Sequence, residues 1–203
     1  MKWKNLIIVI LISFYSTLLK AQHENDTISD WDRTFMPAIQ MGYVGHGTDQ
    51  LSGGLMSQTS IEYRHESNFV LRINYDNLNS KMNIEYPRGP DLTFTGKVSF
   101  SDIIGGIGYR DRDGKHNFTG YIEGGIRNYG YPIFSTDGTQ INLDFDSRNI
   151  GIMRYTLGYE FALAPKLFLT LETLISHTLE SKDFWIDNSW SYGFTLGISA
   201  PLF

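Results

Sequence analysis

The sequence predicts an all-β fold, an eight-stranded antiparallel up-and-down transmembrane β-barrel. Three observations lead to this prediction. Eight runs of residues alternate between apolar and polar side chains, which is the period of a β-strand with two different faces. Short and long connections alternate between the runs, as in single-chain outer-membrane barrels. The polar face is built from arginine, carboxylates and glycine rather than lysine.

The N-terminal segment of this 203-residue chain has the features of a secretory signal. Lys2 and Lys4 precede a short apolar run over residues 6–19, and Ala21 offers a small residue for cleavage. We therefore expect a signal peptide over residues 1–21, a flexible periplasmic lead-in over 22–36 and the barrel over 37–203. An uncleaved anchor is the alternative, but an apolar run of about 14 residues is too short to cross a bilayer comfortably as a helix.

Composition narrows the classes of function. The chain has no cysteine, so it has no disulfide framework, no thiolate metal site and no lipid-attachment cysteine. Its net charge of −5 becomes more negative when the signal peptide and its lysines are removed, which argues against nucleic acid as a partner. No later segment approaches the roughly 18 apolar residues of a transmembrane helix, so a membrane-spanning form must be a closed barrel.

The eight runs and their connections follow a regular order along the chain. The runs cover residues 37–46, 55–65, 69–80, 97–110, 118–131, 150–163, 167–179 and 190–202. The short connections, which carry turn residues, lie at 66–68, 111–117 and 164–166. The long connections lie at 47–54, 81–96, 132–149 and 180–189. This alternation predicts short periplasmic turns and long extracellular loops, with both termini in the periplasm.

Within the runs, one face is apolar and the other is polar. From the second run to the eighth, the apolar face carries Leu55, Ile61 and Tyr63; Phe69, Leu71, Ile73 and Tyr75; Ile103, Ile107 and Tyr109; Phe118, Ile122 and Ile126; Met153, Tyr155, Leu157, Tyr159, Phe161 and Leu163; Leu169, Leu171 and Ile175; and Trp190, Tyr192, Phe194, Leu196 and Ile198. A period of two that persists this long indicates β-strands throughout.

The choice of charged residues decides which face points inward. A soluble lipocalin-like barrel would place its apolar face inside, whereas a membrane barrel places it against lipid. Every lysine lies in the signal, in a connection or at the start of a run (Lys97), while the strand centres carry arginine, which favours bidentate pairing with confined carboxylates. We therefore expect a buried charge network formed by Glu62, Arg64, Arg72, Asp76, Asp102, Arg110, Glu123, Arg127, Arg154, Glu160 and Glu172.

Small and aromatic residues support the same orientation. An eight-stranded barrel has an interior just wide enough for side chains, so long charged groups need small neighbours. The polar face supplies them at Gly42, Gly106, Gly108, Gly125, Gly158, Gly193 and Gly197. Outward aromatic residues beside the short turns, the place of an interfacial girdle, are Tyr63, Phe69, Tyr109, Phe118 and Phe161.

The C-terminal run resembles the β-signal that the outer-membrane insertion machinery recognises. Its order of a polar residue, a glycine and two apolar residues falls on Ser191, Gly193, Leu196 and Ile198. The chain also ends in an aromatic residue, Phe203, but in the opposite phase to the apolar face. Either Pro201 marks a bend, or the terminal aromatic is incidental.

As a whole, the mature chain resembles the OmpA transmembrane domain and OmpX in architecture, through its eight strands and its interior of arginines and carboxylates. The resemblance implies a location in the outer membrane of a Gram-negative cell. It also implies outer-membrane lipid, lipopolysaccharide and the insertion machinery as partners, and no cofactor. A protein partner at the extracellular loops is a further expectation.

The long loops carry the candidate interaction residues. Apolar residues alternate on both sides of the turns at 87–90 and 137–138, as in strand pairs that continue past the membrane in OmpX. An exposed edge of such a sheet can add a strand from another chain. The interaction candidates are Tyr86, Phe94, Phe134, Phe145, Phe184 and Trp185. Alternatively, these rings pack on one another or rest at the headgroups.

A lipid-modifying enzyme and a pore are the alternative functions. His65-Glu66-Ser67-Asn68 matches the His-x-Ser-Asn element of the lipid A 3-O-deacylases, but it lies in the first short turn, away from the outer leaflet. At the position of that family's site, the segment from His177 lacks the serine. A narrow solute or ion pore is opposed by the paired charges in the lumen. We therefore expect a non-enzymatic structural or interaction module, with no catalytic, metal or cofactor site.

Overall fold

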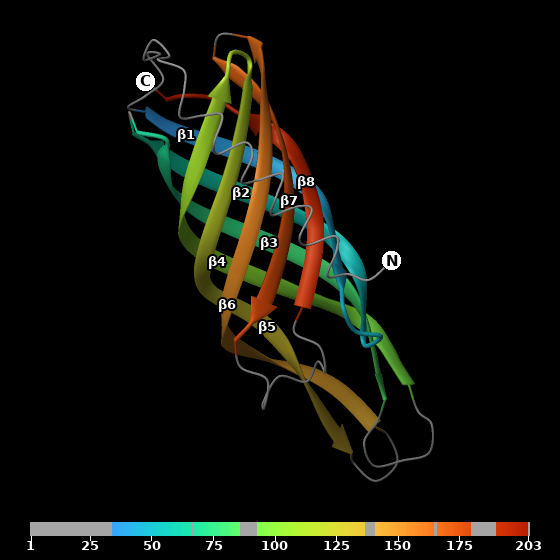
Figure 1. Ribbon diagram of the computed structural model, residues 1–203. Coiled ribbons are helices and arrows are strands. Elements are labelled where there is room, and N and C mark those ends of the chain that lie inside the picture. The colour runs from blue at the N-terminus through green and yellow to red at the C-terminus, as the bar shows by residue number, and fades with distance from the viewer. Residues whose placement is uncertain are drawn as a thin grey trace, which may run out of the picture.

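Eight antiparallel strands form a closed barrel in the computed structural model, which describes residues 34–65, 67–85, 93–136, 141–164, 166–179 and 190–202. Each strand pairs with the one before it in the chain, and the last pairs with the first, so the order around the barrel is the order in the sequence (Figure 1). The predicted up-and-down barrel is thereby confirmed. Among the described residues, no helix is long and apolar enough to cross a membrane.

The first six strands are longer than the sequence predicted, whereas the last two end earlier than predicted. They are β1 (Thr34–His46), β2 (Leu51–Arg64), β3 (Phe69–Glu85), β4 (Thr93–Asp113), β5 (His116–Thr136), β6 (Ile141–Ala164), β7 (Leu167–Thr178) and β8 (Trp190–Ser199). β1 starts at Thr34 rather than near residue 37, because Thr34 to Met36 already pair with the end of β2. The predicted signal peptide lies outside the described residues.

Three predicted connections are shorter in the structure than the sequence predicted. The connection expected over 111–117 narrows to Gly114 and Lys115, and Gly114 has a φ of 59°, which only glycine adopts freely. The loops expected over 81–96 and 132–149 are largely strand, because β3 pairs with β4 out to Glu85–Thr93 and β5 with β6 out to Thr136–Ile141. Lys97 therefore lies within β4 rather than at its start.

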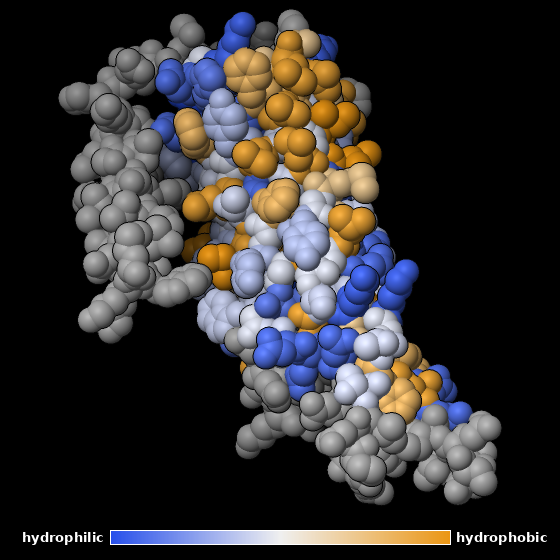
Figure 2. Space-filling view, turned by 90° about the vertical axis from the view of Figure 1, so that its right-hand side faces the viewer, coloured by the Kyte–Doolittle hydropathy of each residue, from blue (hydrophilic) through white to orange (hydrophobic). Residues whose placement is uncertain are grey.

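The exterior of the barrel is apolar, as the alternation predicted. Leu55 is 68% exposed, Met41 67% and Ile39 65%. Exposure of such large apolar side chains to water would cost free energy. Figure 2 shows apolar residues gathered over the upper part of one face, with hydrophilic residues in a zone below them. A continuous apolar exterior of this extent marks a surface that contacts lipid.

Aromatic side chains of β1 to β6 lie on the exterior near the short turns. The outward pairs are Phe35–Tyr63, with ring centroids 5.2 Å apart, Phe69–Tyr109 at 6.1 Å and Phe118–Tyr159 at 5.2 Å. In the same region, the rings of Phe161 and His116 are tilted relative to each other, with their centroids 5.3 Å apart. Aromatic rings in this place favour the headgroup level of a bilayer, so this end of the barrel lies at one membrane surface.

The β-signal residues lie in the strand that closes the barrel. Leu196 and Ile198 are 52% and 51% exposed and face outward, whereas Ser191 is buried in the lumen. After β8 the chain keeps following β1, because the backbone N–H of Leu202 donates to the carbonyl of Phe35 at 2.9 Å. Phe203 lies outside the described residues.

Candidate functional site

The lumen contains all eleven residues of the predicted charge network, and none of them exposes more than 5% of its surface. Arg72 lies at the centre of the half nearer the short turns. Its Nε and Nη2 each donate to Glu123 at 3.0 Å, and its Nη1 donates to Glu172 at 2.6 Å. The guanidinium also lies 3.6 Å from the centre of the Tyr121 ring. One arginine from β3 is thus tied to β5 and β7 across the barrel.

Arg64 forms a second set of ion pairs in this half of the lumen. It donates to Glu62 on its own strand at 2.8 Å and to Glu160 on β6 at 2.5 Å. The Tyr121 hydroxyl donates to the other oxygen of Glu62 at 2.7 Å, so this buried carboxylate has partners at both oxygens. Arg110 is also buried, and it lies opposite Thr119 in the β4–β5 ladder.

A separate group of charges lies further from the short turns. Arg127 forms a bidentate pair with Asp102, with both donor–acceptor distances at 2.8 Å. Arg154 lies 2.5 Å from Asp76 and 3.3 Å from Asp102. The two groups together connect strands β2 to β7 through the lumen. Four of the buried arginines contact a carboxylate on another strand, and they are Arg64, Arg72, Arg127 and Arg154.

Glycine makes room for these side chains, and Gly106 shows how. A Cβ atom on Gly106 would lie 2.4 Å from the carbonyl oxygen of Ile122 and 2.7 Å from Cγ of Glu123. On the neighbouring Gly105, which faces outward, the nearest such atom is 3.8 Å away. Only the inward glycine is therefore required for close packing of the strands and their charges.

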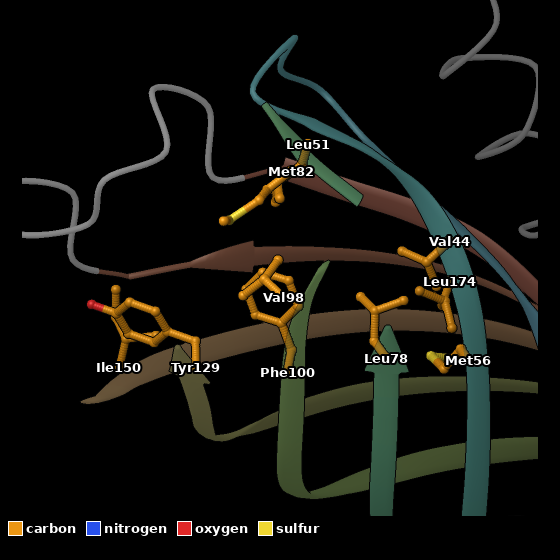
Figure 3. Packing of buried hydrophobic residues seen from close by; sticks show 10 residues of the cluster. All are labelled: Val44, Leu51, Met56, Leu78, Met82, Val98, Phe100, Tyr129, Ile150 and Leu174. Carbon is orange, nitrogen blue, oxygen red and sulfur yellow. The ribbon is translucent and has the colours of Figure 1, made fainter. Parts of the chain in front are cut away.

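An apolar cluster occupies the lumen beyond the charges, on the side away from the short turns, and it was not predicted from the sequence. Its side chains come from seven of the eight strands and converge between them (Figure 3): Val44, Leu51, Met56, Leu78, Met82, Val98, Phe100, Tyr129, Ile150 and Leu174. The guanidinium carbon of Arg127 lies 5.3 Å from the centre of the Phe100 ring, where this cluster meets the charges. A detectable signal was that Phe100 and Ile150 share the phase of inward Asp102 and Arg154.

Two hairpins continue beyond the closed ring of strands. The β4–β5 ladder ends at Phe100–Tyr129, and beyond that pair β4 continues only with β3 and β5 only with β6 (Figure 1). The hairpins touch again through Phe94 and Phe134, whose ring centroids are 5.3 Å apart. The two hairpins are therefore in contact beyond the closed ring.

The predicted loop candidates fall into three groups. Phe94 and Phe134 are half-buried because they pack on each other, as the alternative interpretation expected. Phe145 is 41% exposed on β6 and is available for contact. Tyr86, Phe184 and Trp185 lie outside the described residues.

Two backbone donors on β6 are occupied by neighbouring side chains. β6 pairs with β7 only from Ile152 onward, so the segment before it has no strand on that side among the described residues. There, Asp144 accepts from the N–H of Phe145 and Asp146 accepts from the N–H of Ser147, each at 2.8 Å. Donors that are already bonded do not recruit another strand, so these aspartates protect the edge.

Within the described ranges, the contacts of His46, His65 and His177 do not form a hydrolytic triad. His65 Nδ1 lies 3.3 Å from the Ser67 hydroxyl in the first short turn, and His177 packs on Trp190 with ring centroids 4.5 Å apart. The contacts of His46 were not predicted from the sequence. Its Nδ1 lies 3.1 Å from the Ser191 hydroxyl, and its Nε2 lies 2.9 Å from the Ser80 hydroxyl. Because hydroxyls engage both nitrogens, neither is left for the orienting carboxylate of a catalytic triad.

Metal ligation has no support in the described part of the chain, which contains no group of three or more histidine, aspartate or glutamate side chains suited to a metal ion. The acidic residues of the lumen bond to arginines instead.

Comparison with known proteins agrees with the geometry. Neisserial surface protein A is similar to this chain with a TM-score of 0.58 and 13% identity, over 82% of this chain and 96% of that one. OprG of Pseudomonas aeruginosa has a TM-score of 0.56 at 7% identity, over 84% and 97%. Ail of Yersinia pestis has a TM-score of 0.52 at 14% identity, over 84% and 99%. No family model matches the chain, and no curated protein matches it.

Identities this low show a shared fold alone. The fold is that of small outer-membrane β-barrels. Together with the apolar exterior and the charged lumen, it describes this chain as an eight-stranded barrel of the outer membrane.

Proposed function

We propose that this outer-membrane barrel is non-enzymatic and acts as an interaction module through the β3–β4 and β5–β6 hairpins. The observation that carries the proposal is that both hairpins continue as paired strands beyond the closed ring and pack on each other through Phe94 and Phe134. Order outside the membrane is not needed to close a barrel. A pre-ordered surface lowers the entropic cost of binding a partner.

The lumen supports a scaffold role rather than transport. Guanidinium and carboxylate groups fill its centre, and the apolar cluster closes the extracellular side. Buried charges in such a network must stay paired, because an uncompensated one costs several kcal/mol. A lumen filled in this way holds eight strands in register and presents the hairpins rigidly.

The exposed surface of the β5–β6 hairpin indicates the chemistry of a protein partner. Ile133 is 43% exposed, and its direct cross-strand neighbour is Asp144, which is exposed as well. Asp146 lies two residues further along β6 and is also exposed. An apolar residue bordered by carboxylates fits a protein with an apolar contact and basic groups around it.

The experiment is co-purification from outer membranes in mild detergent. One variant replaces residues 131–146 with an Asn-Gly turn, which leaves the pairing of Tyr129 with Phe100 in place. A point variant, Ile133→Asp, changes only the exposed face, and Lys166→Gln in a short turn is the control. We expect a defined partner with the native chain and the control, and loss of it with both hairpin variants. The proposal would be overturned if the variant without residues 131–146 recovered the same partner, or if the native chain recovered none.

The non-enzymatic part of the proposal has its own test. Lipid A acyl chains from a deletion strain should have the same masses as those from strains that carry the native chain, His46→Ala or His177→Ala. A deletion-dependent change that His46→Ala reproduces would show lipid hydrolysis instead.

A further inference from the structure

The outward face of the β3–β4 hairpin changes polarity in ordered steps from membrane to solvent. Tyr75 opposite Ile103 is the last apolar pair, and two hydrogen-bonded pairs follow it. These are Asn77–Ser101 at 2.9 Å and Asn79–Ser99 at 2.6 Å, with the serine hydroxyl donating in each. Asn128 on β5 extends this polar level, since it donates to Ser147 at 2.8 Å and to Asn149 at 2.9 Å on β6.

The next pair beyond this polar level is Lys81 opposite Lys97. Both side chains are exposed on the same face. Directly opposed residues in antiparallel strands have Cβ atoms about 4.5–5.5 Å apart, and like charges at that spacing repel each other. Within the described ranges, no carboxylate forms an ion pair with either ammonium. Among the side chains that the structure describes, these two adjacent cations therefore have no counter-charge.

We propose that Lys81 and Lys97 bind a phosphate group of the anionic glycolipid in the outer leaflet, of the lipid A type. A phosphate placed between the two ammonium groups would turn their repulsion into two charge-assisted contacts. Asn79 adds a third donor: its side-chain oxygen accepts from Ser99, which leaves its amide N–H groups for a ligand. Long flexible lysine stems can bend toward the headgroups just below them.

The position of the pair favours lipid over a soluble anion. It follows immediately after the polar level that ends the apolar exterior, on a face that continues the lipid-facing surface of β3 and β4. The headgroup phosphates of a leaflet lie just outside its hydrocarbon core, at that same level. This inference depends on the orientation of the barrel and not on the proposed protein partner.

The test measures lipid retention by the refolded barrel in nanodiscs of a neutral phospholipid. Native mass spectrometry compares the occupancy of bis-phosphorylated lipid A with that of the same lipid without phosphates. The native chain should prefer the phosphorylated lipid by about tenfold or more, a ratio that corresponds to 1.4 kcal/mol. Lys81→Gln with Lys97→Gln should abolish the preference, whereas Lys115→Gln with Lys166→Gln in the short turns should retain it.

Lys81→Glu separates binding from folding. It replaces a repulsive pair by an opposite-charge pair, so the barrel should be no less resistant to heat on a gel than the native chain. The preference for the phosphorylated lipid should nevertheless be lost, as in the double glutamine variant. The proposal is overturned if the native chain shows no phosphate preference, or if the Lys81 and Lys97 variants keep it. Equal displacement by a soluble sulfated oligosaccharide would also overturn it, since the site would then be one for free polyanions.

Discussion

At the scale of single residues, arginine in the lumen joins strands that are distant in sequence. Arg72 contacts carboxylates on β2, β5 and β7, at Glu62, Glu123 and Glu172. Removing one partner from a buried network leaves charges without compensation, which costs far more than the pair itself contributes. The stability of the barrel is therefore most sensitive to changes at these inward arginines.

Arg72→Met tests this sensitivity. It leaves the carboxylates of Glu123 and Glu172 without their guanidinium, so the free energy of unfolding should fall by about 3–5 kcal/mol. Urea titration in lipid vesicles measures the difference against the native chain. Lys166→Met, in a short turn, should change the free energy by less than about 0.5 kcal/mol. Equal effects of the two substitutions would contradict a structural role for the network.

Gly105 and Gly106 form a matched pair for the packing of the lumen. Gly106→Ala places a methyl group 2.4 Å from the Ile122 carbonyl, whereas Gly105→Ala has no contact closer than 3.8 Å. We expect Gly106→Ala to cost about 1–3 kcal/mol and Gly105→Ala to be tolerated. The fraction of chain that migrates as folded barrel on an unheated gel reports the outcome. A tolerated Gly106→Ala would show that this close approach of strands is not required.

The sequence could place charges inside but could not pair them. Alternation alone assigned Arg64 and Glu160 to the polar face, yet these residues are 96 positions apart and meet only because of the stagger of the closed barrel. Tyr121, Asn74 and Thr156 complete the network through hydrogen bonds to Glu62 and Glu123. A period of two contains no information about which strands face each other across a lumen.

At the scale of elements, the two hairpins are the distinctive feature. Their existence could be predicted from the alternating apolar residues around the turns at 87–90 and 137–138. Their contact could not, because Phe94 and Phe134 lie on strands that have already separated from each other. The apolar cluster was missed for a related reason: once the polar face had been assigned to the lumen, Phe100 and Ile150 had no predicted place.

Phe94→Ala tests whether the hairpins support each other. The aromatic pair is worth about 0.5–1.5 kcal/mol beyond its buried area, so its loss should make the hairpins open more often. Protease cleavage on intact cells should accelerate several-fold within 131–146. Ile133→Ala, an exposed position outside the Phe94–Phe134 contact, should leave the cleavage rate unchanged. Unchanged cleavage in Phe94→Ala would mean that the hairpins are independent.

At the scale of the whole molecule, charges fill the lumen and apolar side chains close it on one side. The native barrel should therefore show no steady ionic current in planar bilayers. A double variant with serine in place of both Phe100 and Tyr129 removes two large side chains from the apolar cluster. We expect a steady current only in that variant. A steady current through the native chain would contradict the closed lumen and would favour the pore.

The central claim is that apolar side chains contact lipid while charged side chains face each other in the lumen. The chain has no cysteine, so single cysteines can be introduced and spin-labelled at outward Ile122 and inward Ser176. In lipid vesicles, the label at Ile122 should be accessible to oxygen and shielded from a water-soluble nickel reagent, and the label at Ser176 should be shielded from both. Access of the nickel reagent to Ile122 at the level of a water-exposed residue would contradict the account.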